Sequence, residues 1–225
     1  EHSLATKKLK GWLKLHPHNI SQKINVIVEH FREFVWPLLD GKAKAMIVVG
    51  SRKEAVRWKL ALDRYITHKG YPMGTLVAFS GEVNDKDSGQ DSFTEKSQKL
   101  NPGLKGNIRE AFKRDDRQIL LVANKFQTGF DQPLLCGMYV DRRLSGIQAV
   151  QTLSRLNRCY PDKSITYVVD FINEPEEILA SFKTYYSTAE LAEESDPDVI
   201  LDLKTKLDAQ SYYDEREIEK VVKVI

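Results

Sequence analysis

The sequence predicts an α/β protein with a mostly parallel sheet that is flanked by helices. Apolar runs typical of buried strands occupy residues 45–50, 75–79, 118–123, 137–141 and 165–171. Segments of helical periodicity alternate with these runs, at residues 51–70 and 105–114 and from about Ile147. Continuous apolar runs suit strands covered on both faces, and strands that alternate with helices form βαβ units.

Capping residues mark where the first helices begin and end. Residues 21–39 show helical periodicity behind a Ser21 cap, and Gly41 then interrupts the pattern. A second helix is expected to run from a Ser51 cap to a stop at Gly70. A hydroxyl at the start and a glycine after the end are the residues that satisfy the free backbone groups of helix termini.

Two further segments depart from this alternation. Residues 80–103 are polar and too long for an ordinary connection, so we expect a loop, with or without one short helix. Residues 174–194 and 195–210 read as helices, the second with Ser195 or Asp196 as its cap. They predict a C-terminal helical extension beyond the sheet.

We therefore expect three parts in this chain. Residues 1–40 form an N-terminal linker and helix, residues 41–175 form the α/β domain, and residues 176–225 form the helical extension. The chain opens on a polar segment and stops inside an apolar pattern, as a fragment of a longer protein would.

Composition narrows the class of protein. The 225 residues include 34 Lys and Arg against 32 Asp and Glu, so the net charge of +2 gives no bulk attraction to nucleic acid. The two cysteines, Cys136 and Cys159, lack metal-type spacing, and we expect no metal site. No run approaches the length of a membrane span and no signal peptide is evident, which favours a cytoplasmic protein without membrane contact.

Three loops that follow predicted strands carry polar side chains. They are GSR at residues 50–52, NKFQTGFDQP at 124–133, and the Arg142–Arg143 pair after Asp141. The carboxyl ends of parallel strands meet at one edge of a sheet, where α/β proteins bind ligands. Each loop also has a simpler explanation. GSR suits a capped helix start, Asp131 a turn, and the arginine pair a solvated surface.

The segment AVQTLSRLNR, residues 149–158, adds a cationic stripe to this edge. We expect this segment to be a helix, in which Gln151, Arg155 and Arg158 share one narrow sector because they are spaced by four and three residues. Two arginines one turn apart repel, and a phosphate or carboxylate would relieve that repulsion. The alternative is that both arginines are solvated or paired with acids.

These loops and this segment together resemble a known family. From about residue 16 to 177, and most strongly over residues 119–158, the sequence resembles the second RecA-like motor domain of superfamily 2 helicases. It is most similar to the motor region of the R subunit of type I restriction enzymes. The resemblance implies an ATP-driven duplex DNA translocase within a restriction endonuclease.

The resemblance also implies a role for individual residues. QTLSRLNR looks like motif VI, in which Arg158 is the candidate arginine finger, Arg155 lies beside it and Gln151 positions the site. TGFD looks like motif V, with Gly129 and Asp131 as ATP-binding candidates and Asp131 near the nucleotide ribose or the motif VI arginines. Candidates for contact with the DNA backbone are Ser51, Arg52 and Thr128, the first two at the place of motif IV.

The pattern departs from the wider superfamily in two ways and lacks two of its motifs. Ser154 stands where many members carry glycine, and Thr128 stands where many carry arginine. No GxxxxGK[ST] phosphate loop and no DExH box occur in the sequence. We therefore expect that the fragment alone does not hydrolyse ATP, and that ATP and Mg²⁺ are bound mainly by a first motor domain elsewhere in the parent chain.

The same resemblance implies the partners. They are duplex DNA, the first RecA-like domain and the nuclease domain of the parent chain, and the modification and specificity subunits of the restriction complex. Two alternatives stay open: the motor half of another superfamily 2 repair or remodelling ATPase, and an α/β module that binds a nucleotide or a protein without hydrolysis. A phosphate loop and DExH box upstream would favour a motor, and a nuclease domain before them would favour restriction.

Overall fold

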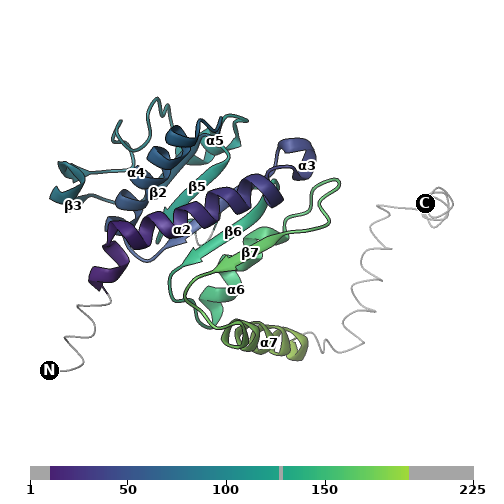
Figure 1. Cartoon of the computed structure of the whole chain (residues 1–225). Coiled ribbons are helices and arrows are strands. Elements are labelled where there is room, and N and C mark those ends of the chain that lie inside the picture. The colour runs from purple at the N-terminus through teal and green to yellow at the C-terminus, as the bar shows by residue number, and fades with distance from the viewer. Residues whose placement is uncertain (1–10, 127–128, 193–225) are drawn as a thin grey trace, which may run out of the picture. The chain divides into compact units, whose positions relative to one another are not determined.

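The computed structural model describes residues 11–126 and 129–192 (Figure 1). Residues up to Phe182 form one compact unit, and a second unit begins at Lys183. The helices are α2 (Pro17–His30), the π-helical η1 (Phe31–Val35), α3 (Leu38–Gly41), α4 (Arg52–Lys69), the 3₁₀ turn η2 (Lys86–Ser88), α5 (Ile108–Lys113), α6 (Ile147–Leu153), the 3₁₀ turn η3 (Ser154–Asn157) and α7 (Pro175–Ala192). The strands are β1 (Lys44–Val49), β2 (Thr75–Phe79), β3 (Val83–Asp85), β4 (Gln90–Phe93), β5 (Ile119–Ala123), β6 (Leu135–Asp141) and β7 (Tyr167–Asp170).

Five strands form a parallel sheet in the order β2-β5-β1-β6-β7. Every residue of β1, β2, β5 and β6 is buried, as the continuous apolar runs require. The expected α/β class, a parallel sheet flanked by helices, is confirmed. The division of the chain at residues 40 and 175 stays a prediction.

Each face of the sheet has its own core, because successive strand side chains point to opposite sides. In β1, Ala45, Ile47 and Val49 pack with α2 and α4, whereas Met46 and Val48 pack with α5 and α6. Figure 1 shows α2 and α4 lying over one side of the strands. The largest fully buried side chain, Trp58 of α4, belongs to this first core.

The ends of α4 agree with the capping pattern, but the first helix differs from it. Ser51 caps α4, and Gly70 ends it in the left-handed conformation with φ of 68°. The expected helix at 21–39 instead begins at Pro17, where the side chain of His16 accepts from the backbone N–H of His18. Proline at the first helical position is favoured because its missing N–H would be unpaired there. Ser21 therefore lies inside the helix.

Residues 80–103 contain a two-stranded antiparallel hairpin of β3 and β4 with η2 between them, rather than a plain loop. The segment after the hairpin protects the edge strand β2. Asn101 is fully buried and exchanges two hydrogen bonds with the backbone of Val77, 2.9 and 2.8 Å long. A side-chain amide thus does what a neighbouring strand would do for this edge.

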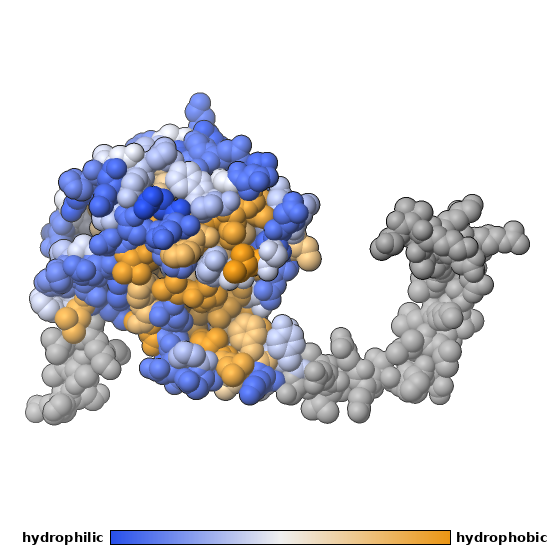
Figure 2. All heavy atoms as spheres, turned by 45° about the vertical axis from the view of Figure 1, so that its right-hand side comes forward, coloured by the Kyte–Doolittle hydropathy of each residue, from blue (hydrophilic) through white to orange (hydrophobic). Residues whose placement is uncertain are grey.

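The opposite edge, β7, is more exposed. Val168 is 47% exposed, and other exposed large apolar side chains include Ile165 and Leu179. Figure 2 shows apolar residues gathered on one side of the molecule. The expected helix at 195–210 lies outside the described residues.

Candidate functional site

The three loops that carry polar side chains begin side by side at the carboxyl edge of the sheet. Val49 of β1 is in register with Ala123 of β5 and with Asp141 of β6. The loops that follow these three residues therefore start from adjacent positions. The sequence predicted this convergence from the expected parallel direction of the strands.

The loop between β1 and α4 is closed by a carboxylate from within the chain. The Ser51 hydroxyl accepts from the backbone N–H of Glu54 at 3.2 Å and donates to its carboxylate at 2.9 Å. The Gly50 N–H donates to the other carboxylate oxygen at 3.2 Å. Glu54, only 7% exposed, thus holds donors that the sequence assigned to an external phosphate. The arrangement is a variant of the capping box in which the glutamate accepts from the N–H of Gly50 rather than of Ser51, and the spacing S-x-x-E could have revealed it.

Arg52, the second DNA-contact candidate, is exposed in the first turn of α4. Its Nη1 donates to the carbonyl oxygen of Ser80 at 3.3 Å, just after β2. The contact is long and neutral, so the guanidinium keeps its charge available at the surface. Arg52 therefore fits an external phosphate better than Ser51 does.

The loop after β5 is supported by the segment that follows the β3–β4 hairpin. Lys125 Nζ donates to both carboxylate oxygens of Glu95, at 2.7 and 2.6 Å. Glu95 also accepts from the backbone N–H of Phe79 at 3.2 Å. The side chains of Lys125 and Glu95 are 25% and 21% exposed. Neither this pair nor its bridging role was evident from the sequence, because 30 residues separate the partners.

Arg155 and Arg158 converge on one short segment of the same loop. Arg155 Nη1 donates to the carbonyl oxygen of Phe130 at 2.9 Å. Arg158 Nε pairs with Asp131 Oδ1 at 2.9 Å, with side chains that are 47% and 69% exposed. The two arginines therefore bind adjacent residues of the loop, one through the main chain and one through a carboxylate.

The continuous helix expected over residues 149–158 is wrong. The α-helix α6 ends at Leu153, the 3₁₀ turn η3 follows, and Arg158 has an extended backbone with φ of −77° and ψ of 127°. At the junction, the Ser154 hydroxyl donates to the carbonyl oxygen of Val150 at 2.5 Å. Such back-bonding by serine disturbs regular helix geometry. Arg155 and Arg158 still lie close together, but across a 3₁₀ turn.

The two arginines differ in burial, because Arg155 is half-buried and Arg158 is exposed. Burial, followed by the charge of Arg158, lowers the pKa of Arg155, and Asp131 acts in the opposite direction. A small cavity of about 10 Å³ lies where Arg155, Arg142 and Asn124 meet, and it has room for about one water molecule. Arg142 Nη1 donates to Asn124 Oδ1 at 2.8 Å there. A space of this size is too small for a nucleotide.

The remaining predicted site residues are placed as follows. Gly129 has φ of 65°, a left-handed conformation that favours glycine. Gln151 is half-buried on α6, one turn before Arg155. Thr128 lies outside the described residues.

Asp141, the last residue of β6, and Arg143 form ion pairs with residues of two helices. Asp141, 1% exposed, accepts from Lys23 of α2 at 2.6 Å. This ion pair fixes α2 to the carboxyl edge of the sheet. Arg143 pairs with Glu177 of α7 at 2.6 Å. The sequence predicted the arginine loop but not these two contacts.

Among residues 11–126 and 129–192, no group of three or more His, Cys, Asp or Glu side chains is placed to hold a metal ion. None of the helices in those ranges is long and apolar enough to cross a membrane.

Comparison with known proteins connects this edge of the sheet to restriction enzymes. Residues 101–173, which include Asp131, Arg155 and Arg158, match the family described as type I restriction enzyme subunit R domain 3. A Methanocaldococcus jannaschii protein, named as the endonuclease subunit of type I restriction enzyme MjaVIIP, is 30% identical over 185 residues, or 78% of this chain. The type I restriction enzyme HindI endonuclease subunit of Haemophilus influenzae is 26% identical over 152 residues, or 64% of this chain.

This chain spans a small part of those relatives, 17% of the first and 14% of the second. Among solved structures, the C-terminal domain of the DEAD-box protein Dbp5 aligns with a TM-score of 0.42 and 15% identity, over 73% of this chain and 78% of that domain. The C-terminal part of the Fun30 ATPase domain aligns with a TM-score of 0.42 and 13% identity, over 71% of this chain and 44% of the other.

Proposed function

Because this chain is related to subunit R of type I restriction enzymes, we propose that it is the second motor domain of an ATP-driven duplex DNA translocase. It supplies arginines to ATP that another domain of the parent chain holds. The observation that carries the proposal is the attachment of Arg155 and Arg158 to the adjacent residues Phe130 and Asp131 at the carboxyl edge of the sheet.

Arg155 and Arg158 have different roles. Arg155 is half-buried and its guanidinium binds a main-chain carbonyl, so it positions the loop and the side chain beside it. Arg158 is exposed and its Nε makes a single ion-pair contact with an exposed carboxylate. A phosphate can replace that carboxylate at small cost, because exposed ion pairs contribute only about 0 to 1 kcal/mol. Arg158 is therefore the arginine finger, and Asp131 holds it when the cleft is open.

ATP bound between two motor domains supplies the phosphoryl group that is transferred. A guanidinium beside that group stabilises the charge spread over its oxygens, and its planar fork binds two of them at once. The cationic surface at Arg158 suits the phosphates of ATP. Mg²⁺, like ATP, is bound mainly by the other motor domain.

Arg52 grips the DNA backbone, with Thr128 as a second contact. Contacts of this kind position a protein on DNA and carry little sequence information, so target choice belongs to partner subunits. We expect Arg52→Ala to weaken duplex binding by this chain and to reduce the slope of log K against log salt by about one. An unchanged slope would remove Arg52 from the DNA contact.

The wider assignments follow from the same proposal. The parent chain also carries the first motor domain and a nuclease domain, and it works in the cytoplasm with modification and specificity subunits. If the parent chain lacks a phosphate loop, the translocase assignment fails and a nucleotide- or protein-binding module takes its place.

DNA-stimulated ATP hydrolysis by the full-length subunit, assembled with its partner subunits, tests the proposal. Arg158→Ala is expected to lower turnover by about 10³-fold or more, because an arginine finger contributes about 10³ to 10⁵ in rate. Arg114→Ala is a matched control, since Arg114 is 59% exposed, pairs with Asp116 and lies outside the site. Equal turnover in Arg158→Ala and the parent would refute the role of Arg158.

A further inference from the structure

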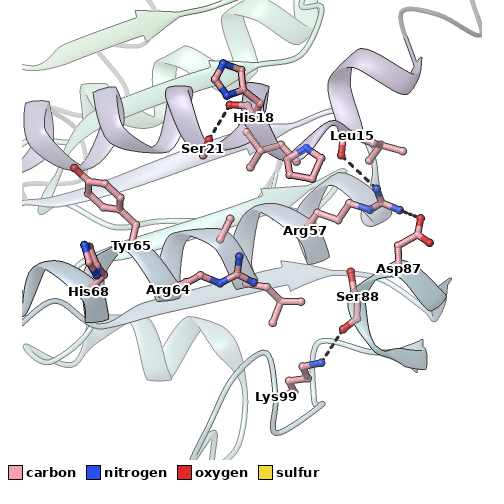
Figure 3. A pocket seen from close by; sticks show the side chains of 14 residues that line it. Leu15, His18, Ser21, Arg57, Arg64, Tyr65, His68, Asp87, Ser88 and Lys99 are labelled. Atoms are coloured by element: carbon pink, nitrogen blue, oxygen red, sulfur yellow. Dashed lines mark hydrogen bonds and ion pairs between the residues drawn. The ribbon is translucent and has the colours of Figure 1, made fainter.

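A groove between α2 and α4 is lined by residues other than the proposed phosphate contacts Arg52 and Arg158. It has a volume of about 690 Å³ and is bordered on its third side by η2 and Lys99. Figure 3 shows α2 and α4 on either side of it, with Arg57 and Arg64 extending from α4. We call it the α2–α4 groove.

The floor of the α2–α4 groove is apolar. Its lining includes Leu15, Pro17, Ile20, Leu60 and Ala61. Leu60 and Ala61 are only half-buried, although both pack against the core on that face of the sheet. When a partner covers apolar surface of this kind, the free energy falls because the surface is removed from water. A phosphate group or a sugar has too little apolar surface to do this.

The rim of the groove is cationic. Arg57, Arg64 and His68 follow one another on α4 at intervals of seven and four residues, so they share one face of the helix. The charge of Arg57 is already neutralised by Asp85 and Asp87. In contrast, Arg64 is exposed and makes no ion pair with any described residue.

Lys99 adds a second uncompensated charge. Its Nζ donates to the carbonyl oxygen of Ser88 at 2.7 Å and lies 5.7 Å from the centre of the Phe93 ring. Both contacts are with neutral groups, so the ammonium charge is unpaired within the described part of the chain. The groove therefore combines an apolar floor with two cations that have no acidic partner.

We infer that the α2–α4 groove is the docking site for an acidic amphipathic helix of a partner polypeptide. Two neighbouring helices offer a groove into which the apolar face of a third helix fits, with anchors at i, i+3, i+4 and i+7. Carboxylates on the flanks of that helix reach Arg64 and Lys99. Duplex DNA has the charge but lacks the apolar face that the floor requires.

Along α4, the residues that line the groove begin at Arg57 and lie beyond Arg52. Arg52 begins the helix at the carboxyl edge of the sheet, and Arg64 lies twelve residues further, or about 18 Å along the axis. A partner that contacts Arg64 could therefore leave Arg52 uncovered. This separation makes the docking site testable by itself.

The test measures binding of a fluorescein-labelled 20-residue helical peptide, with leucines on one face and glutamates elsewhere, to the 225-residue chain. Fluorescence anisotropy at low salt gives the affinity. A second peptide with glutamine in place of glutamate tests charge. We expect Arg64→Glu to weaken binding of the acidic peptide about tenfold, and Ala61→Gln to weaken it by filling the floor.

Lys42→Glu is the matched control, because Lys42 is exposed, lies outside the groove and undergoes the same change of charge. It should change affinity by less than about twofold. Thermal unfolding of each variant establishes that the fold is kept. The inference is overturned if the parent chain does not bind the acidic peptide, if the glutamine peptide binds equally well, or if Lys42→Glu causes the same loss. It is also overturned if Arg64→Glu weakens binding of duplex DNA and leaves peptide binding unchanged.

Discussion

Arg57–Asp85 and Arg158–Asp131 are two arginine–aspartate pairs with opposite physical characters. Arg57 binds Asp85 through two parallel hydrogen bonds, from Nε at 2.9 Å and from Nη2 at 2.7 Å, and Asp85 is 1% exposed. Arg158 binds Asp131 through one contact, and both side chains are largely exposed. The first pair joins α4 to the hairpin, whereas the second lies at the carboxyl edge of the sheet.

The difference shows how the same two residue types serve structure or function. A buried pair with two hydrogen bonds loses much when one partner is removed, because a desolvated charge is left alone. An exposed pair with one bond gains little from its partner and can exchange it for another anion. Burial and geometry, rather than residue identity, are the reasons why we assign the proposed ligand contact to Arg158.

Breaking the buried pair is expected to produce the largest change in stability. Arg57→Ala removes both guanidinium hydrogen bonds from the buried Asp85, which keeps Ser88 and the more distant Lys53 at 3.8 Å, and should lower the free energy of unfolding by about 2 to 4 kcal/mol. For a domain of this size that corresponds to a fall in Tm of roughly 5 to 15 °C.

Arg114→Ala sharpens the comparison, because Arg114 also makes two hydrogen bonds to an aspartate, Asp116, but both side chains are more than half exposed. Its loss should cost less than about 1 kcal/mol. Thermal or urea unfolding measures both variants. An equal loss in the two would mean that burial does not set the value of these pairs.

The buried pair should also show in the pH dependence of stability. Burial acts to raise the pKa of Asp85, but hydrogen bonds from Arg57 and Ser88 and the charge of Arg57 outweigh it and leave the pKa below the ordinary 3.8. A carboxyl with a lowered folded-state pKa stabilises the fold above its unfolded pKa, and this contribution is lost as pH falls through the folded value.

The difference in unfolding free energy between the parent and Arg57→Ala should therefore be constant above about pH 5 and shrink below about pH 3.8. Urea unfolding across that range measures it. A difference that stays constant down to about pH 3 would show that Asp85 does not carry the effect.

The smallest change in stability is expected at the exposed pair. Asp131→Ala removes an acid that is 69% exposed and should change the free energy of unfolding by less than about 0.5 kcal/mol. Urea unfolding measures it beside Arg57→Ala. A loss as large as that of Arg57→Ala would mean that Asp131 is a structural residue and that Arg158 is not available for exchange.

The parts of the fold that could be predicted are those in which local sequence decides the structure. The strands at 75–79 and 118–123 follow from continuous apolar runs, and α4 follows from Ser51 and Gly70. The β3–β4 hairpin could not be predicted, because its sequence is polar and its partner contacts are distant. One of them, Arg57 to Asp85, spans 28 residues.

The candidate site divides in the same way. The convergence of the loops follows from the parallel direction of the strands, and the proximity of Arg155 to Arg158 follows from their spacing in the sequence. The end of α6 at Leu153 depends on a hydroxyl contact from Ser154 that helix periodicity does not report. The engagement of Ser51 by Glu54 competes with the phosphate contact expected for that serine, and only the structure shows the carboxylate in place.

We propose that Arg57 maintains the fold and that Arg158 acts on the ligand, and one paired measurement tests both roles. The full-length subunit carrying Arg57→Ala or Arg158→Ala is assembled with its partners, and both DNA-stimulated ATP hydrolysis and Tm are recorded. We predict that Arg158→Ala keeps the parent Tm within about 2 °C and loses turnover by about 10³-fold or more, whereas Arg57→Ala lowers Tm and keeps most turnover below its melting range. Parent-like turnover in Arg158→Ala, or a loss of turnover that only follows a fall in its Tm, would contradict the role of Arg158 as the arginine finger.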